Sequence, residues 1–211
     1  MHVVLIHGMG RTPRSMGRLG RRLTEHGHEV SYFGYGVRSS TLDALAARFS
    51  RELSAVARRG PYAVIGHSLG NVIYRLAEPS LDRLPAQVVM LAPPNTPSAA
   101  ARLLSELPVA RVLFRAITGH AGERLVDADF YAALPVPRAP ALVLAGDRGP
   151  RGALPFERAP NDGLVAVEET RLPAHPGAPR SEHEVVPAIH TFIMNHPRVL
   201  RRIEDALSGH R

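Results

Sequence analysis

Short apolar runs alternate with stretches of helical spacing along nearly the whole chain. Each run is bounded by glycine, proline or polar residues, which is typical of strands buried in a parallel sheet. The six predicted strands are Val3–Ile6, Glu29–Phe33, Tyr62–Ile65, Gln87–Leu91, Ala141–Ala145 and Glu184–Ala188. Strands that alternate with helices in this way predict an α/β fold, with a mostly parallel, doubly wound sheet covered by helices on both faces.

Capping and breaking residues set the expected limits of the helices. Thr12–Pro13 predicts the start of the first helix, and Ser40 with Asp43 three residues later fits a capping box for the second. Pro79 is expected to end the helix after the third strand, and Pro197 to begin the last helix.

The segment 98–134 interrupts this alternation of strands and helices. Its helical patches carry more apolar surface than a short crossover needs, so we expect a small helical cap that partly lines an acyl pocket. A crossover helix packed wholly onto the sheet is the alternative. The apolar positions are Leu103, Leu104, Leu107, Val109, Val112, Leu113, Phe114 and Ile117.

The bulk composition fits one domain over residues 1–211, since 45% hydrophobic residues can build one sizeable core. The chain has no cysteine, which excludes disulfides and thiolate metal sites. The first residues form neither a signal peptide nor a long apolar stretch, and no run of ~18 apolar residues predicts a membrane span. We therefore expect a soluble, cytoplasmic protein.

The formal charge of +7 and pI near 10.8 raise the question of anionic partners. The basic residues are arginines scattered along the chain and form no polybasic run interleaved with aromatics. Nucleic acid is therefore not an expected partner, whereas weak association with an anionic membrane surface stays open. The oligomeric state stays undetermined.

Residues 66–70 read G-H-S-L-G and match the pattern G-x-S-x-G. Such a short pattern occurs often by chance, but here an apolar strand precedes it and a helix follows it. In that setting the serine occupies a strained turn that lifts its hydroxyl out of the sheet, beside the positive end of the helix. Ser68 is therefore the candidate nucleophile.

Residues 7–10 read H-G-M-G at the end of the first strand, which fits an oxyanion loop. Glycines allow backbone N–H groups to turn toward a developing negative charge, and the N–H groups of Met9 and Leu69 are the expected donors. The alternative is an ordinary strand-end turn with a capped histidine at His7.

The turn that carries Ser68 between strand and helix is called a nucleophile elbow. A serine in such an elbow requires a histidine base, and in folds with this elbow the acid and then the base follow the serine along the chain. Four histidines remain as candidates. We favour His190, which follows the last predicted strand and opens the apolar turn Thr191–Met194. His196 is expected to cap the last helix, while His175 and His183 lie in a polar, proline-rich loop.

Two carboxylates compete for the role of the acid that orients this base. Asp162 lies in N-D-G-L-V, where the following apolar pair can anchor its loop. Asp147 ends the fifth predicted strand just before an arginine-glycine-proline turn, which it could simply cap. We favour Asp162 and keep Asp147 as the alternative.

Together these motifs resemble those of compact bacterial α/β-hydrolases of the lipase/esterase kind, over nearly the whole chain. The segments that carry the resemblance are 7–10, 66–70, 92–95, 146–147, 161–165 and 190–192. One departure is Asn71, which stands where a second glycine is common in that family.

The resemblance implies cleavage of a small-molecule ester or lipid through an acyl-serine intermediate, with Ser68, Asp162 and His190 as the triad. It implies no cofactor, and the histidines show no metal-ligand spacing. The same fold also hosts thioesterases, acyltransferases and non-catalytic binding proteins. A complete set of three residues in the expected order disfavours the binding protein.

Overall fold

The computed structural model describes residues 1–38, 40–106, 124–152, 154–174 and 181–209. Its centre is a six-stranded sheet in the order β2-β1-β3-β4-β5-β6, in which every neighbouring pair is parallel. The strands are β1 (His2–Ile6), β2 (Glu29–Phe33), β3 (Tyr62–His67), β4 (Gln87–Leu91), β5 (Ala141–Gly146) and β6 (Glu182–Val186).

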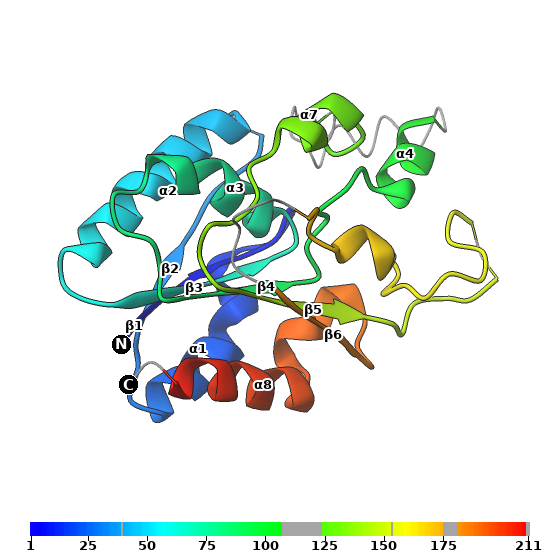
Figure 1. Cartoon of the computed structure of the whole chain (residues 1–211). Coiled ribbons are helices and arrows are strands. Elements are labelled where there is room, and N and C mark those ends of the chain that lie inside the picture. Colours follow the sequence, from blue (N-terminus) through cyan, green and yellow to red (C-terminus); the bar gives the residue numbers. More distant parts are fainter. Residues whose placement is uncertain (39, 107–123, 153, 175–180, 210–211) are drawn as a thin grey trace.

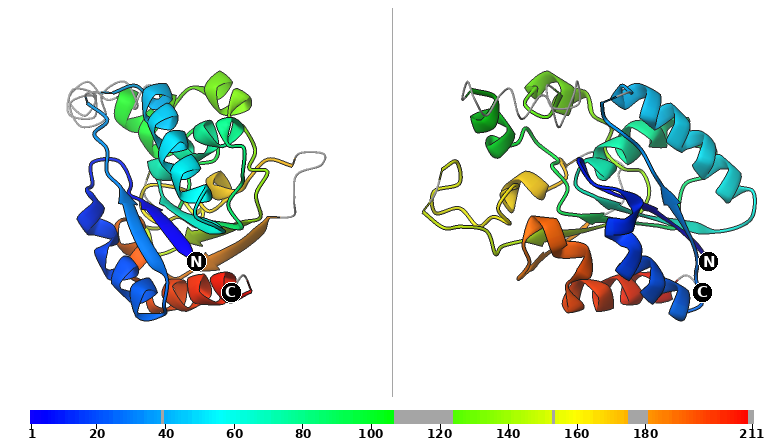
Figure 2. Two further views of the ribbon diagram at one scale, coloured as in Figure 1. Left: turned by 90° about the vertical axis from the view of Figure 1, so that its left-hand side faces the viewer. Right: turned by 180° about the vertical axis from the view of Figure 1, so that it is seen from behind.

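Helices cover both faces of this sheet, as the alternating pattern predicts (Figure 1). The described α-helices are α1 (Gly17–Glu25), α2 (Leu42–Ala57), α3 (Leu69–Ala77), α4 (Ala99–Glu106), α7 (Ala128–Ala133) and α8 (Pro197–Ser208). The described 3-10 helices are η1 (Pro13–Met16), η2 (Glu78–Ser80), η3 (Glu168–Thr170) and η4 (His190–Asn195). Helices α1 and α8 lie on one face and α2 and α3 on the other, which the side view makes clear (Figure 2).

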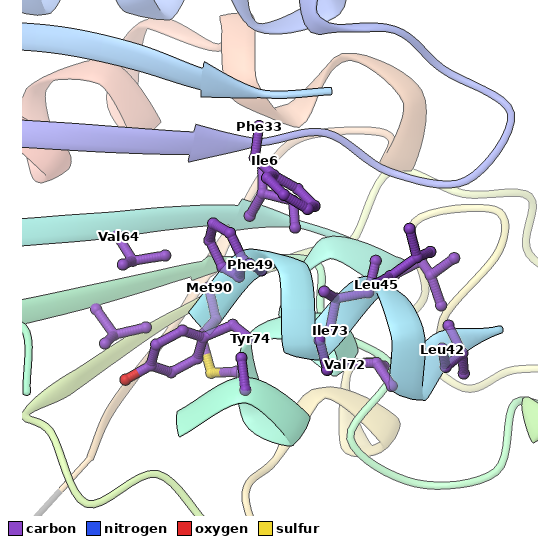
Figure 3. Packing of buried hydrophobic residues seen from close by; sticks show 14 of the residues in the cluster. Ile6, Phe33, Leu42, Leu45, Phe49, Val64, Val72, Ile73, Tyr74 and Met90 are labelled. Carbon is purple, nitrogen blue, oxygen red and sulfur yellow. The ribbon is translucent and has the colours of Figure 1, made fainter. Parts of the chain in front are cut away.

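Each face of the sheet has its own apolar layer, because successive side chains of a strand point to opposite sides. In β1, Val4 and Ile6 pack toward α2 and α3, while Val3 and Leu5 pack toward α1 and α8. On the first side Phe33 contacts Phe49 of α2, with ring centroids 4.5 Å apart (Figure 3). The α/β fold predicted from the sequence is thus confirmed.

Two predicted boundaries are wrong. The side chain that caps α2 belongs to Thr41, whose Oγ1 accepts from the N–H of Ala44 at 3.1 Å, so the expected capping box of Ser40 and Asp43 does not form. The last strand ends at Val186, because Pro187 has no N–H to donate and the N–H of Ala188 turns back to the carbonyl of Val186 at 2.8 Å.

Other local predictions are confirmed, although one cap differs. Pro197 begins α8, and the His196 ring accepts from the N–H of Arg198 at 3.3 Å, as expected of a cap. Thr12 precedes η1 but makes no side-chain capping bond there. Pro79 follows the end of α3 and lies within η2.

The segment expected to form a cap joins β4 to β5. Its first helical patch is α4, while residues 107–123 lie outside the described residues, and with them Leu107, Val109, Val112, Leu113, Phe114 and Ile117. Arg75 of α3 fastens both ends of this connection. Its guanidinium donates to Oδ1 of Asn95 at 3.1 Å and to the carbonyls of Leu134 and Pro135 at 2.9 and 2.7 Å. The base of the connection is therefore anchored next to the helix that follows the elbow.

Candidate active site

Ser68 occupies the turn between β3 and α3. Its backbone has φ 50° and ψ −121°, a conformation that side chains adopt at a cost and that is found at functional sites. The turn packs directly against the end of β1, because a Cβ atom on Gly70 would lie 2.8 Å from the carbonyl oxygens of Ile6 and His7. The pattern G-x-S-x-G therefore needs glycine at position 70 for close approach to the neighbouring strand.

Asn71 holds the same turn from the inside. Its buried amide donates to the carbonyl of Ser68 at 3.2 Å and to the carbonyl of Leu91 in β4 at 3.3 Å. A Cβ atom on Gly66 would lie 2.2 Å from its Oδ1, so glycine at position 66 makes room for this side chain. The residue that departs from the family pattern is thus a structural link between the elbow and the next strand.

His190 lies between Ser68 and Asp162. Its Nε2 is 3.0 Å from Oγ of Ser68, and its Nδ1 is 2.8 Å from Oδ2 of Asp162. A carboxylate can only accept here, so Nδ1 carries the proton and Nε2 is left to accept from the serine hydroxyl. The three side chains favoured from the sequence therefore form one continuous chain of hydrogen bonds.

The Asp162 carboxylate is held by its own loop. Oδ1 accepts from the N–H groups of Leu164 at 3.0 Å and Val165 at 2.8 Å, and the side chain is fully buried. Charge-assisted bonds of this kind satisfy a buried carboxylate and fix its orientation. Both residues of the apolar pair after Asp162 hold the carboxylate through their backbone N–H groups, but only the Val165 side chain is buried, whereas Leu164 is exposed.

The competing candidates lie elsewhere. The Asp147 carboxylate is 29% exposed and lies 3.7 Å from Nε of Arg148. His183 shares a hydrogen bond of 2.8 Å with Thr170, and His196 caps α8. His175 lies outside the described residues.

Both residues expected to supply the oxyanion donors lie near Ser68. Leu69 is the first residue of α3, so its N–H is one of those that a helix leaves without an internal partner, at the positive end of the helix dipole. Met9 is half-buried and lines the cavity above Ser68.

His7 turns away from the serine. Its Nδ1 donates to the carbonyl of Gly8 at 2.8 Å, its Nε2 accepts from the N–H of Tyr35 at 3.3 Å, and the two rings stack at 4.3 Å. Burial lowers the pKa of His7, so the ring is neutral at neutral pH. These contacts fix the loop of residues 7–10, which carries Met9. A turn with a capped histidine and a loop that lines the cavity at Ser68 are therefore compatible in this structure.

His67, next to Ser68, is a second buried histidine of the site. Its Nε2 donates to the carbonyl of His190 at 3.0 Å, and burial holds its pKa well below the ordinary value. The ring is therefore neutral and places no charge beside His190. It links the elbow to the turn that carries the candidate base.

A cavity of about 330 Å³ opens over Ser68 and His190. Its walls are mostly apolar and include side chains from α4 and from the Asp162 loop. The other lining residues are Met9, Arg11, His67, Pro94, Ser98, Ala100, Ala101, Leu104, Leu125, Leu164, Val165 and Thr191. An apolar group attached to a reacting carbonyl can be accommodated there.

The model of the alpha/beta hydrolase family matches residues 3–204, which is nearly the whole chain. The chain belongs to the alpha/beta hydrolase family. Comparison with curated proteins finds no match.

Solved structures of this fold include several hydrolases. The mature lipase BlEst2 of Bacillus licheniformis superposes with a TM-score of 0.78 at 15% identity, covering 97% of this chain and 91% of that one. The phospholipase PlaB of Legionella pneumophila gives a TM-score of 0.75 at 17% identity, covering 98% of this chain and 59% of that one. The NocB thioesterase domain of the nocardicin cluster gives 0.63 at 18% identity, covering 99% and 94%. At these identities the similarity concerns the fold.

One residue that supports the site of this α/β-hydrolase, Glu169, could not be recognised from a sequence pattern. Glu169 accepts from the N–H of Ala99 at the start of α4 (2.7 Å) and from the N–H of Ala166 in the Asp162 loop (2.9 Å). Burial raises the pKa of its carboxyl group. Glu169 therefore ties the wall of the cavity to the loop that holds Asp162.

Among the residues that the structure describes, no group of three or more His, Asp or Glu side chains is arranged so that it could hold a metal ion. None of the helices there combines the length and apolar character that crossing a bilayer requires.

Proposed function

We propose that this α/β-hydrolase cleaves a carboxylic ester through an acyl-serine intermediate. The hydrogen-bonded chain from Asp162 through His190 to Ser68 carries the proposal, because it supplies a nucleophile, its base and an orienting carboxylate in contact with one another. The lipase, phospholipase and thioesterase structures of the same fold support hydrolysis of an acyl group.

In the first half-reaction Oγ of Ser68 attacks the ester carbonyl carbon while His190 Nε2 takes the hydroxyl proton. The carbonyl oxygen becomes an oxyanion, which the N–H groups of Met9 and Leu69 stabilise. The C–O bond to the alcohol then breaks, and His190 returns the proton to the departing alcohol oxygen. The acyl group remains on Ser68.

In the second half-reaction a water molecule takes the place of the alcohol. His190 accepts a proton from the water as its oxygen attacks the acyl-serine carbonyl. The bond to Oγ then breaks and Oγ receives that proton, which releases the carboxylic acid and restores the enzyme. Asp162 keeps the proton of Nδ1 in place and balances the positive charge on the ring in both halves.

The substrate is a small-molecule ester or lipid whose acyl chain lies in the apolar cavity. We propose that the segment 98–134 acts as a cap over this cavity. Ala100, Ala101 and Leu104 of α4, with Leu125, supply part of its wall. Closing an apolar wall around the carbonyl also excludes water from the first step.

A fluorophosphonate probe tests this proposal, because it labels only an activated serine. We expect the wild-type protein to be labelled and to hydrolyse p-nitrophenyl butyrate, and Ser68→Ala to lose both, with kcat falling by several orders of magnitude, on the order of 10⁴ or more. Ser98→Ala is the matched control: Ser98 lines the same cavity but its hydroxyl contacts the carbonyl of Leu164, 3.4 Å away. Labelling that survives Ser68→Ala would refute the assignment.

A further inference from the structure

Arg11 brings a positive charge to the wall of an otherwise mostly apolar cavity. Among the described lining residues it is the only arginine, and none is an aspartate or glutamate. Its Nη2 donates to the carbonyl of Thr191 at 2.8 Å, and its guanidinium carbon lies 5.8 Å from the centre of the Phe192 ring. These contacts hold the guanidinium beside the turn that begins with His190.

The hydrogen-bonding capacity of Arg11 is largely unused. A guanidinium has several N–H donors, and the bonds found among the described residues engage only Nη2. Nε is buried without a partner there, and no described carboxylate pairs with this arginine. A charge beside an apolar cavity is costly unless an anion compensates it.

Arg75 shows what a purely structural arginine looks like in this fold. It is fully buried, and Nε, Nη1 and Nη2 each donate to an acceptor of the protein. Arg11 makes one such bond and faces the cavity. Arg11 is half-buried, and its remaining donors are available to a ligand in the cavity.

The position of Arg11 indicates which part of the substrate it could contact. In the proposed function, on which this inference rests, His190 Nε2 protonates the departing alcohol oxygen, so the alcohol part lies beside His190. Arg11 is bound to the carbonyl of Thr191, the next residue. We propose that Arg11 binds an anionic group, a phosphate or a carboxylate, on the alcohol part of the ester. The planar guanidinium suits both groups, since it can donate two parallel bonds to either.

Three butyrate esters that differ at the far end of the alcohol test this assignment: propyl butyrate, 3-(butyryloxy)propyl phosphate and 4-(butyryloxy)butanoate. We expect the wild-type kcat/KM to be higher for at least one anionic ester than for propyl butyrate, by about tenfold. Arg11→Gln is expected to bring that ratio close to one, and Arg11→Lys to keep part of it. The two anionic esters distinguish phosphate from carboxylate.

Arg14→Gln is the matched control, because Arg14 is an exposed arginine of η1 and lies outside the cavity wall. It is expected to keep the wild-type ratio. If the wild type shows no preference for either anionic ester, or if Arg11→Gln lowers kcat/KM for all three esters by one common factor, the inference is wrong and Arg11 only supports the turn at Thr191.

Calorimetric titration with 3-hydroxypropyl phosphate and with 4-hydroxybutanoate reads the same site without turnover. The inference is supported if the wild type binds either alcohol, Arg11→Gln does not, and Arg14→Gln still does. This holds even if none of the esters is hydrolysed, and then only the proposed function fails. Hydrolysis without the preference and without Arg11-dependent binding refutes the inference and leaves the proposed function standing.

Discussion

His190 and Asp162 are joined twice. Their side chains meet at 2.8 Å between Nδ1 and Oδ2, and the N–H of His190 donates to the carbonyl of Asp162 at 2.9 Å. The backbone bond fixes the distance between the two segments, while the side-chain bond selects the tautomer of the ring. A base held in this way presents Nε2 to Ser68 before any substrate arrives, which reduces the reorganisation needed in the reaction.

This double link predicts unequal effects for the two candidate acids. Asp162→Asn is expected to lower kcat for p-nitrophenyl butyrate by about 10³- to 10⁴-fold, because an amide can donate to Nδ1 and thereby favour the wrong tautomer. Asp147→Asn is expected to keep most of the activity, since the Asp147 carboxylate lies against Arg148. Steady-state kinetics of both variants decides the matter, and the reverse ranking would move the acid to Asp147.

Gly66 and Asn71 are expected to be energetically coupled. Gly66→Ala should destabilise the protein, because its new Cβ would lie 2.2 Å from Oδ1 of Asn71. In an Asn71→Ala background the same change should cost less, with a coupling of about 0.5–3 kcal/mol in the free energy of unfolding. Urea denaturation of the two single variants and the double variant measures this coupling. Additive effects would mean that Asn71 does not limit the space at position 66.

The wall contributed by α4 is expected to set the preferred acyl-chain length. Leu104 lines the cavity, whereas its half-buried neighbour Leu103 is not part of the wall. Leu104→Ala should therefore shift the optimum among p-nitrophenyl esters from acetate to decanoate toward longer chains, while Leu103→Ala should keep the wild-type profile. Melting temperatures of both variants control for stability. A profile that both variants change equally would argue against a specific role of Leu104.

The buried His67 predicts a loss of stability in mild acid. Its folded pKa lies well below the ordinary value of 6.5, so above pH 6.5 the ring is neutral in both the folded and the unfolded state. As the pH falls below 6.5 only the unfolded chain takes up the proton, which favours unfolding by up to about 1.4 kcal/mol per pH unit. The loss stops once the pH passes the folded pKa.

Chemical denaturation between about pH 5 and 7, the range in which an ordinary imidazole titrates, measures this slope. His67→Asn is expected to flatten it, although the variant itself is less stable. An unchanged slope in His67→Asn would assign the acid sensitivity to other groups, of which buried His7 is the first to test, because its pKa is shifted in the same direction.

The sequence by itself determined those features of the fold that depend on local patterns. Short apolar runs predict the strands because a parallel sheet buries both of their faces, and Pro197 predicts the start of α8 because proline suits the first turn of a helix. The elbow at Ser68 could also be predicted, since strand, turn and helix follow one another along the chain. The capping box at Ser40 failed because Thr41, one residue later, forms the capping bond instead.

Only the tertiary structure decided which distant groups meet. Asp162 lies 28 residues before His190, and Arg11 lies 180 residues before Thr191, so neither contact follows from periodicity. No sequence pattern pointed to Glu169, because its carboxylate accepts hydrogen bonds from backbone N–H groups of two different segments. Such contacts depend on the order of the strands in the sheet and on the paths of the loops beyond their carboxyl ends. That order brings residues together through space, and no short stretch of sequence contains both partners.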